Sequence, residues 1–139
     1  SRLLFSCSSA KVRLGGVRVL LAEDSIDNQI VFSKVLELAG ALVDTANNGV
    51  VAVEKARGEK YDIILMDIQM PLMDGFEAMA ELRREGCKTP IIALTAHALK
   101  EERQHCLASG FDDHISKPID FNTFIETVAR YCVGISRPN

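Results

Sequence analysis

Short segments rich in apolar and branched residues alternate along this chain with longer segments in which apolar residues recur at helical spacing. The short segments show little polar alternation, which is typical of strands buried on both faces of a sheet. A polar residue directly follows each of them. We predict strands over about 17–22, 42–46, 61–66, 90–94 and 113–116.

The segments after the strands have the period of an amphipathic helix, about 3.6 residues per turn. We predict helices over about 27–39, 50–57, 76–85 and 100–109, and a last helix that begins near 121. In the first helix the apolar positions expected to face the core are Val31, Phe32, Val35, Leu36, Leu38 and Ala39. In the last helix they are Phe121, Phe124, Ile125 and Val128.

Five strand–helix pairs of this kind predict a single α/β domain. Buried parallel strands need helices on both faces, and right-handed crossovers then produce a doubly wound sandwich. With 139 residues the chain is long enough for one core and too short for two. We assign the domain to residues 16–134, with 1–15 as a linker or tail and 135–139 as a tail.

Composition narrows the class of protein. Hydrophobic residues make up 47% and charged residues 25% of the chain, which excludes a disordered segment. The net charge of −3 gives no general attraction to nucleic acid or to an anionic membrane, and no apolar run is long enough to cross one. The four cysteines lie far apart, without zinc-ligand or disulfide spacing. We therefore expect a cytoplasmic domain that contacts neither nucleic acid nor membrane.

The candidate chemistry lies at the ends of the predicted strands. Glu23 and Asp24 follow the first strand, Asp67 the third, Thr95 the fourth and Lys117 the fifth. In doubly wound sheets, ligands bind beyond the carboxyl ends of the strands, where the strand order reverses. One polar residue at a strand end needs no explanation. Clustered carboxylates, however, repel one another unless a cation joins them.

Oxygen ligands with room for water suit Mg²⁺, or Mn²⁺, better than zinc or copper. Asp24 and Asp67 could bind the ion directly, Glu23 through water, and a backbone carbonyl after Asp67 would complete the set. Lys117 adds a second positive charge and Thr95 a hydroxyl. Such an arrangement can receive a phosphoryl group while an aspartate oxygen attacks in line. The residues predict a metal-dependent aspartyl-phosphate, whose phosphoryl donor they do not identify.

Four blocks of this sequence resemble the receiver domains of two-component response regulators, and most of all those of hybrid sensor histidine kinases. The blocks are 19–24, 66–75, 94–98 and 117–118, in the family's order and spacing, and the match covers about 17–133. The resemblance implies a flavodoxin-like fold with five helices and a five-stranded parallel sheet in the order 2-1-3-4-5.

By the same resemblance, Asp67 is the phospho-accepting aspartate, and Glu23 and Asp24 are the acidic pair that organises Mg²⁺. Gln69 occupies the position whose backbone carbonyl binds the metal.

Three further roles follow from the resemblance. Thr95 is the switch hydroxyl that moves toward the phosphoryl group, and Lys117 is the phosphate-binding lysine. The peptide bond between Lys117 and Pro118 is expected to be cis. At the switch position where the family usually has Tyr or Phe, this chain has His114, whose imidazole can also change rotamer.

The function implied is a phosphorelay receiver, which accepts a phosphoryl group from a kinase phosphohistidine and either switches conformation or passes it to a histidine-phosphotransfer protein. If the domain belongs to a hybrid histidine kinase, the parent chain is a kinase, and the domain is its cytoplasmic part. Two alternatives stay open. A Mg²⁺-dependent phosphohydrolase would need a second acid where this chain has Gln69. A degenerate receiver acting as a binding module is opposed by four intact site residues, Asp24, Asp67, Thr95 and Lys117.

Ile26 and Ile30 stand four residues apart beside the predicted site. An exposed pair at this spacing would suit a helix-in-groove contact with the phosphotransfer partner, which the family docks over this edge. The alternative is that both residues complete the core.

Overall fold

The computed structural model describes residues 13–96 and 100–133 of the 139-residue chain. Strands and helices alternate throughout this part of the chain. All the predicted strands and helices are present, and most of them begin or end one or two residues from the predicted position. The elements are β1 (Arg18–Ala22), α2 (Ile26–Leu38), β2 (Leu42–Ala46), α3 (Gly49–Gly58), β3 (Ile63–Asp67), α4 (Gly75–Arg84), β4 (Ile91–Thr95), α5 (Lys100–Ser109), β5 (Asp113–Ser116) and α6 (Phe121–Tyr131).

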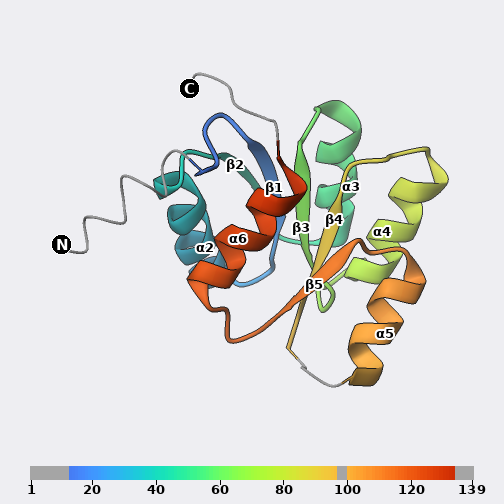
Figure 1. Ribbon diagram of the computed structural model, residues 1–139. Helices are drawn as coiled ribbons and strands as arrows, with labels where there is room; N and C mark the ends of the chain where they lie inside the picture. Colours follow the sequence, from blue (N-terminus) through green and yellow to red (C-terminus); the bar gives the residue numbers. More distant parts are fainter. Residues whose placement is uncertain (1–12, 97–99, 134–139) are drawn as a thin grey trace.

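The five strands form one parallel sheet in the order β2-β1-β3-β4-β5, as predicted. Helices α2 and α6 pack on one face, and α3, α4 and α5 on the other (Figure 1). The three central strands are almost wholly buried between these layers, whereas the edge strand β2 alternates between exposed and half-buried residues. The doubly wound sandwich expected from the continuous apolar strands is therefore confirmed.

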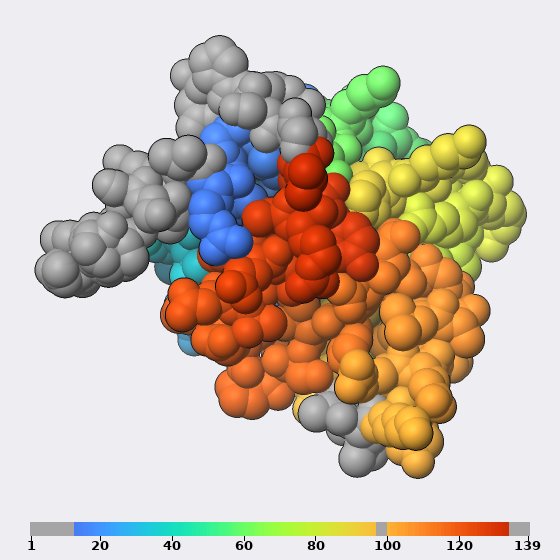
Figure 2. Space-filling view, in the orientation of Figure 1, coloured from blue at the N-terminus to red at the C-terminus, as the bar shows by residue number. Residues whose placement is uncertain are grey.

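Each face of the sheet has its own core. On one face Phe32 of α2 meets Phe124 of α6, with ring centroids 5.6 Å apart. On the other, Phe76 of α4 packs edge-on against Phe111 at 5.6 Å. In Figure 2, α6 and the segment before it cover the front of the first core. These two cores fix the sheet from both sides and leave its carboxyl edge open for chemistry.

For three residues the prediction that they face the core is wrong. Val31 and Leu38 on α2 are 44% and 47% exposed, and Phe121 on α6 is 45% exposed. At about 3.6 residues per turn, Val31 and Leu38 lie roughly 100° and 120° around the helix from Phe32, outside its buried stripe. Phe121 is the first residue of α6, at the end of the helix. Helical spacing alone therefore predicted wider buried faces than the sheet covers.

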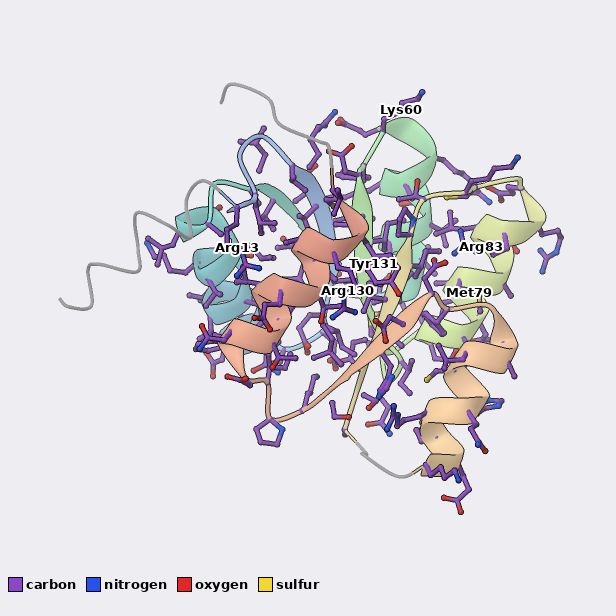
Figure 3. The ribbon with its side chains drawn as sticks, in the orientation of Figure 1. Arg13, Lys60, Met79, Arg83, Arg130 and Tyr131 are labelled. Carbon is purple, nitrogen blue, oxygen red and sulfur yellow. The ribbon has the colours of Figure 1, made fainter. Side chains whose placement is uncertain are left out.

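The packed core begins early in the described chain. Leu14, which lies in the segment predicted to be a linker or tail, is fully buried, and its N–H donates to the Ala39 carbonyl at 3.0 Å. At the other end of the fold, Tyr131 and Arg130 of α6 reach β5 (Figure 3). The Tyr131 hydroxyl lies 3.0 Å from the Asp112 carbonyl oxygen and Arg130 Nη1 lies 3.2 Å from Asp113 Oδ2.

Within the described residues, no helix is long and apolar enough to cross a membrane.

Candidate functional site

Three carboxylates meet at the carboxyl edge of the sheet, at the lower end of the strands in Figure 1. Glu23 and Asp24 follow β1, and Asp67 is the last residue of β3. Since β1 and β3 are neighbours and β2 lies on the other side of β1, this is the point where the strand order reverses. One carboxylate oxygen from each residue lies within 4.8 Å of the other two. Glu23 and Asp67 are 1% and 5% exposed, while Asp24 faces solvent.

Lys117 bridges the two buried carboxylates. Its Nζ lies 2.9 Å from Glu23 Oε1 and 2.8 Å from Asp67 Oδ2. Burial alone would lower the pKa of this ammonium, but the hydrogen bonds to Asp67 and Glu23 outweigh it and raise the pKa above its usual value. The lysine is therefore held in its charged form, between two groups that need a cation.

The surroundings of Glu23 disfavour its charged form. Burial raises the pKa of its carboxyl and the nearby Asp67 charge adds to this, although the hydrogen bond from Lys117 works in the opposite direction. The Ser25 N–H donates to Glu23 Oε2 at 3.2 Å, and Gln29 Nε2 donates to the Glu23 carbonyl at 2.7 Å. Sequence reasoning missed these two positioning contacts. The available signal was the place of both residues at the start of the helix that follows, Ser25 as its N-cap and Gln29 in its first turn.

Asp67 is anchored from its own loop as well. Its Oδ1 accepts the Gln69 N–H at 2.9 Å, and Oδ2 is the atom bound by Lys117. Gln69 itself is exposed, so its backbone lies beside the carboxylate while its side chain faces solvent. The arrangement holds the carboxylate in one orientation through two contacts on different oxygens.

Thr95 and Lys117 are joined through the backbone. The Lys117 N–H donates to the Thr95 carbonyl at 2.7 Å, and the two strands that end there run in parallel register, Thr95 opposite Ser116. Thr95 is fully buried. The peptide bond between Lys117 and Pro118 is cis. All five polar residues singled out from the sequence thus lie at one edge of the sheet.

The acidic cluster fits a divalent cation by its donor chemistry. Every side-chain donor offered by Glu23, Asp24 and Asp67 is a carboxylate oxygen, and oxygen donors suit Mg²⁺ and Mn²⁺. Lys117 neutralises one of the three negative charges, which leaves the cluster with a surplus that a cation would balance.

His114 on β5 is largely buried. Its side chain is 12% exposed, and Nδ1 lies 3.8 Å from Asp113 Oδ1. Burial lowers the pKa of the imidazole and the nearby charge of Arg103 lowers it further, with Asp113 acting against both. The neutral form is therefore favoured in the folded domain.

This burial has a measurable consequence for stability. As the pH falls below the ordinary histidine pKa of 6.5, His114 takes up its proton in the unfolded chain before it does so in the folded one. Protonation thus favours unfolding in this range. The variant His114→Phe is expected to lose less unfolding free energy than the parent between about pH 7 and pH 5, as measured by urea titration. An equal pH dependence of His114→Phe and the parent would exclude this role for His114.

Ile26 and Ile30 are both on the outer side of α2, 60% and 62% exposed. They lie roughly 120° and 160° around the helix from Phe32. The interpretation that they complete the core is therefore wrong, and they form an exposed apolar pair in the first turns of the helix that follows Glu23 and Asp24.

Comparison with known protein families decides the classification. Residues 19–129 match the family of response regulator receiver domains. The matched residues include the strand ends that carry the acidic cluster and Lys117. The chain belongs to this family. As a receiver domain, it has the fold, strand order and clustered acids expected from the sequence motifs.

Its relatives include sensor histidine kinases. The receiver domain is 39% identical over 139 residues to the probable histidine kinase 2 of Oryza sativa subsp. indica, an alignment that covers 87% of this chain and 13% of that protein. The chain thus spans only a small part of the curated relative.

Solved structures agree with the fold. The receiver domain of sensor histidine kinase PA1611 from Pseudomonas aeruginosa, which has a magnesium ion coordinated in its active site cleft, is 38% identical, with a TM-score of 0.77 over 84% of this chain and 98% of that one. The receiver domain of Ssk1 from Saccharomyces cerevisiae, crystallised with the histidine phosphotransfer protein Ypd1, is 25% identical, with a TM-score of 0.80 over 85% and 90% of the two chains.

Proposed function

We propose that this receiver domain accepts a phosphoryl group on Asp67 from a phosphohistidine, in a reaction that requires Mg²⁺. The observation that carries the proposal is the double contact of Lys117 with Glu23 and Asp67 beside the exposed Asp24. Burying an aspartate between a lysine and two other acids has a cost in folding free energy. Such arrangements are concentrated at functional sites. Membership in the receiver family gives the chemistry for which this arrangement is suited.

The reaction transfers phosphorus between two nucleophiles. An oxygen of Asp67 attacks the phosphorus in line, the new P–O bond forms, and the P–N bond breaks with its electron pair returning to the imidazole nitrogen of the donor. In this proposal the ammonium of Lys117 stabilises charge on the phosphoryl oxygens, and the Thr95 hydroxyl donates a hydrogen bond to one of them after transfer. Mg²⁺, held by Asp24, Asp67, Glu23 through water and the Gln69 carbonyl, would neutralise the remaining charge.

Two other functions are less well supported. A phosphohydrolase that works through an aspartyl-phosphate needs a general acid two residues after the nucleophile, and the exposed amide of Gln69 cannot supply a proton there. A binding module without phosphorylation would not need a lysine between two buried carboxylates.

Labelling experiments test the proposal. The domain is incubated with acetyl phosphate, or with a phosphorylated histidine-phosphotransfer domain, with and without Mg²⁺. We expect one hydroxylamine-sensitive phosphoryl group per chain, mapped to Asp67 by mass spectrometry, and a large loss of labelling when the metal is chelated. Rapid release of phosphate from small esters would favour the hydrolase, and the absence of any labelling would favour the binding module.

We further propose that the partner is a helical histidine-phosphotransfer or kinase domain that docks on Ile26 and Ile30, in a cytoplasmic relay. Their exposure beside the acidic cluster supports this, as does the Ypd1 complex of a structural neighbour. Ile30→Asp should lower transfer from the phosphohistidine domain by about tenfold or more, since it places a charge in an apolar contact. The same change at Leu38, also exposed but two turns further along α2, is the matched control and should leave transfer unchanged.

A further inference from the structure

Leu72 has a backbone conformation that leucine rarely adopts. Its φ is +69°, and it is the only non-glycine residue with positive φ in the part of the chain that the structure describes. The N–H of Met73 donates to the carbonyl of Pro71 at 2.7 Å, across Leu72. A hydrogen bond between residues two apart around a positive φ is a γ-turn of the rare, strained kind. Glycine or asparagine would take this conformation with less strain.

The side chain of Leu72 makes little contribution to packing that would offset this strain. It is 82% exposed, the most exposed of the large apolar side chains among the described residues. Two methionines in the same loop are not exposed in this way. Met70 is buried, and Met73 packs against the core on the face of the sheet that α3, α4 and α5 cover. A strained and unpacked leucine therefore points to a contact outside this domain.

The loop that carries Leu72 is held firmly at both ends. The Gly49 N–H donates to the Met73 carbonyl at 3.1 Å, and the Gly75 N–H donates to the Ile68 carbonyl at 3.1 Å. A side chain at Gly49 would collide with the Met73 carbonyl, and one at Gly75 with the Asp67 carbonyl. The loop is thus fastened to the start of α3 and to the end of β3, the strand that ends in Asp67.

We propose that Leu72 is a contact for the protein that delivers the phosphoryl group, and that it positions the donor histidine over Asp67. This inference rests on the proposed function. Asp67 is 5% exposed, so a histidine on a folded donor reaches it only if the donor surface lies on the loops around the site. One of these loops displays Leu72, and α2 displays Ile26 and Ile30 from the segment after Glu23 and Asp24.

The chemistry of the contact favours a protein donor over a small one. An apolar side chain offers nothing to the phosphoryl group itself, but it can enter an apolar pocket on a helical donor domain. Acetyl phosphate has no such pocket. Leu72 should therefore matter for transfer between proteins and be indifferent for labelling by acetyl phosphate.

The test compares Leu72→Asn and Leu72→Met with the parent. Asparagine tolerates positive φ and removes the apolar contact, whereas methionine keeps the contact. We expect Leu72→Asn to melt at the parent's temperature or above it and to accept the phosphoryl group from a phosphorylated histidine-phosphotransfer domain about tenfold more slowly. Leu72→Met should stay within about twofold of the parent in transfer. Both should be labelled by acetyl phosphate at the parent's rate.

Val133→Asn is the matched control, because Val133 is 81% exposed and follows α6 rather than the loop after β3. It should transfer like the parent. Unchanged transfer to Leu72→Asn would overturn the inference, and so would a lower melting temperature, which would make Leu72 structural. Failure of the parent domain to be labelled by acetyl phosphate would instead overturn the proposed function, so the two failures are distinguishable.

Discussion

Asp67→Asn is expected to abolish phosphoryl labelling, with a loss of roughly a thousandfold or more, while the domain stays folded. The carboxamide keeps the size of the side chain but is not a nucleophile. The change also removes one of the two negative charges that face each other near Lys117, and the Asp67 charge is among the causes that raise the pKa of Glu23. The pKa of Glu23 should therefore shift downward in the variant, which NMR titration of its carboxyl carbon measures.

The control for Asp67→Asn is Glu126→Gln, which removes an exposed carboxylate on α6 away from the site. It should label like the parent. Strong labelling of Asp67→Asn at another residue would refute the assignment of Asp67 as the acceptor.

Lys117→Met is expected to destabilise the domain by about 2–4 kcal/mol, because it leaves two buried carboxylates without their shared cation. Urea titration measures this loss. Added Mg²⁺ should restore part of it, since the ion would balance the same charges, and Lys117→Arg should lose less because it keeps the charge. Labelling should fall in Lys117→Met even with the metal present.

The stability of Lys117→Met should also depend on pH in a definite direction. The pKa of Glu23 is already raised by burial, and without the ammonium it should rise further. An acid whose pKa is higher in the folded state stabilises the fold below its unfolded value of 4.5, and this contribution is lost as the pH rises through the folded value. The variant should therefore be closest to the parent in stability at acidic pH. An equal deficit at all pH values would mean that the loss comes from packing alone.

The sheet and the site could be predicted from the sequence because both depend on the same local feature. Each strand is a short apolar run that stops at a polar residue, so Asp67 and Thr95 are placed at the edge by the pattern itself. The shared contact of Lys117 with Asp67 and Glu23 could not be predicted in this way. Lys117 lies 50 positions after Asp67 and 94 positions after Glu23, so the contact depends on the complete fold.

Helix faces were harder to predict than strand ends. The apolar residues of α2 cover more than one side of the helix, and only the neighbouring layers decide which side is buried. Val31 and Leu38 therefore look like Phe32 and Leu36 in the sequence but stay exposed in the fold. The γ-turn at Leu72 had no signal either, because leucine is not a residue that marks a positive φ.

The separation between the buried site and its apolar rim bears on how such a domain can be re-targeted. Glu23, Asp67 and Thr95 are at most 5% exposed, so their neighbours constrain every change there. Ile26, Ile30 and Leu72 are at least 60% exposed and contribute little to the core, so they can be exchanged at small cost in stability. If these three residues form the proposed docking surface, grafting those of another receiver onto this one should change partner choice and leave the buried site as it is.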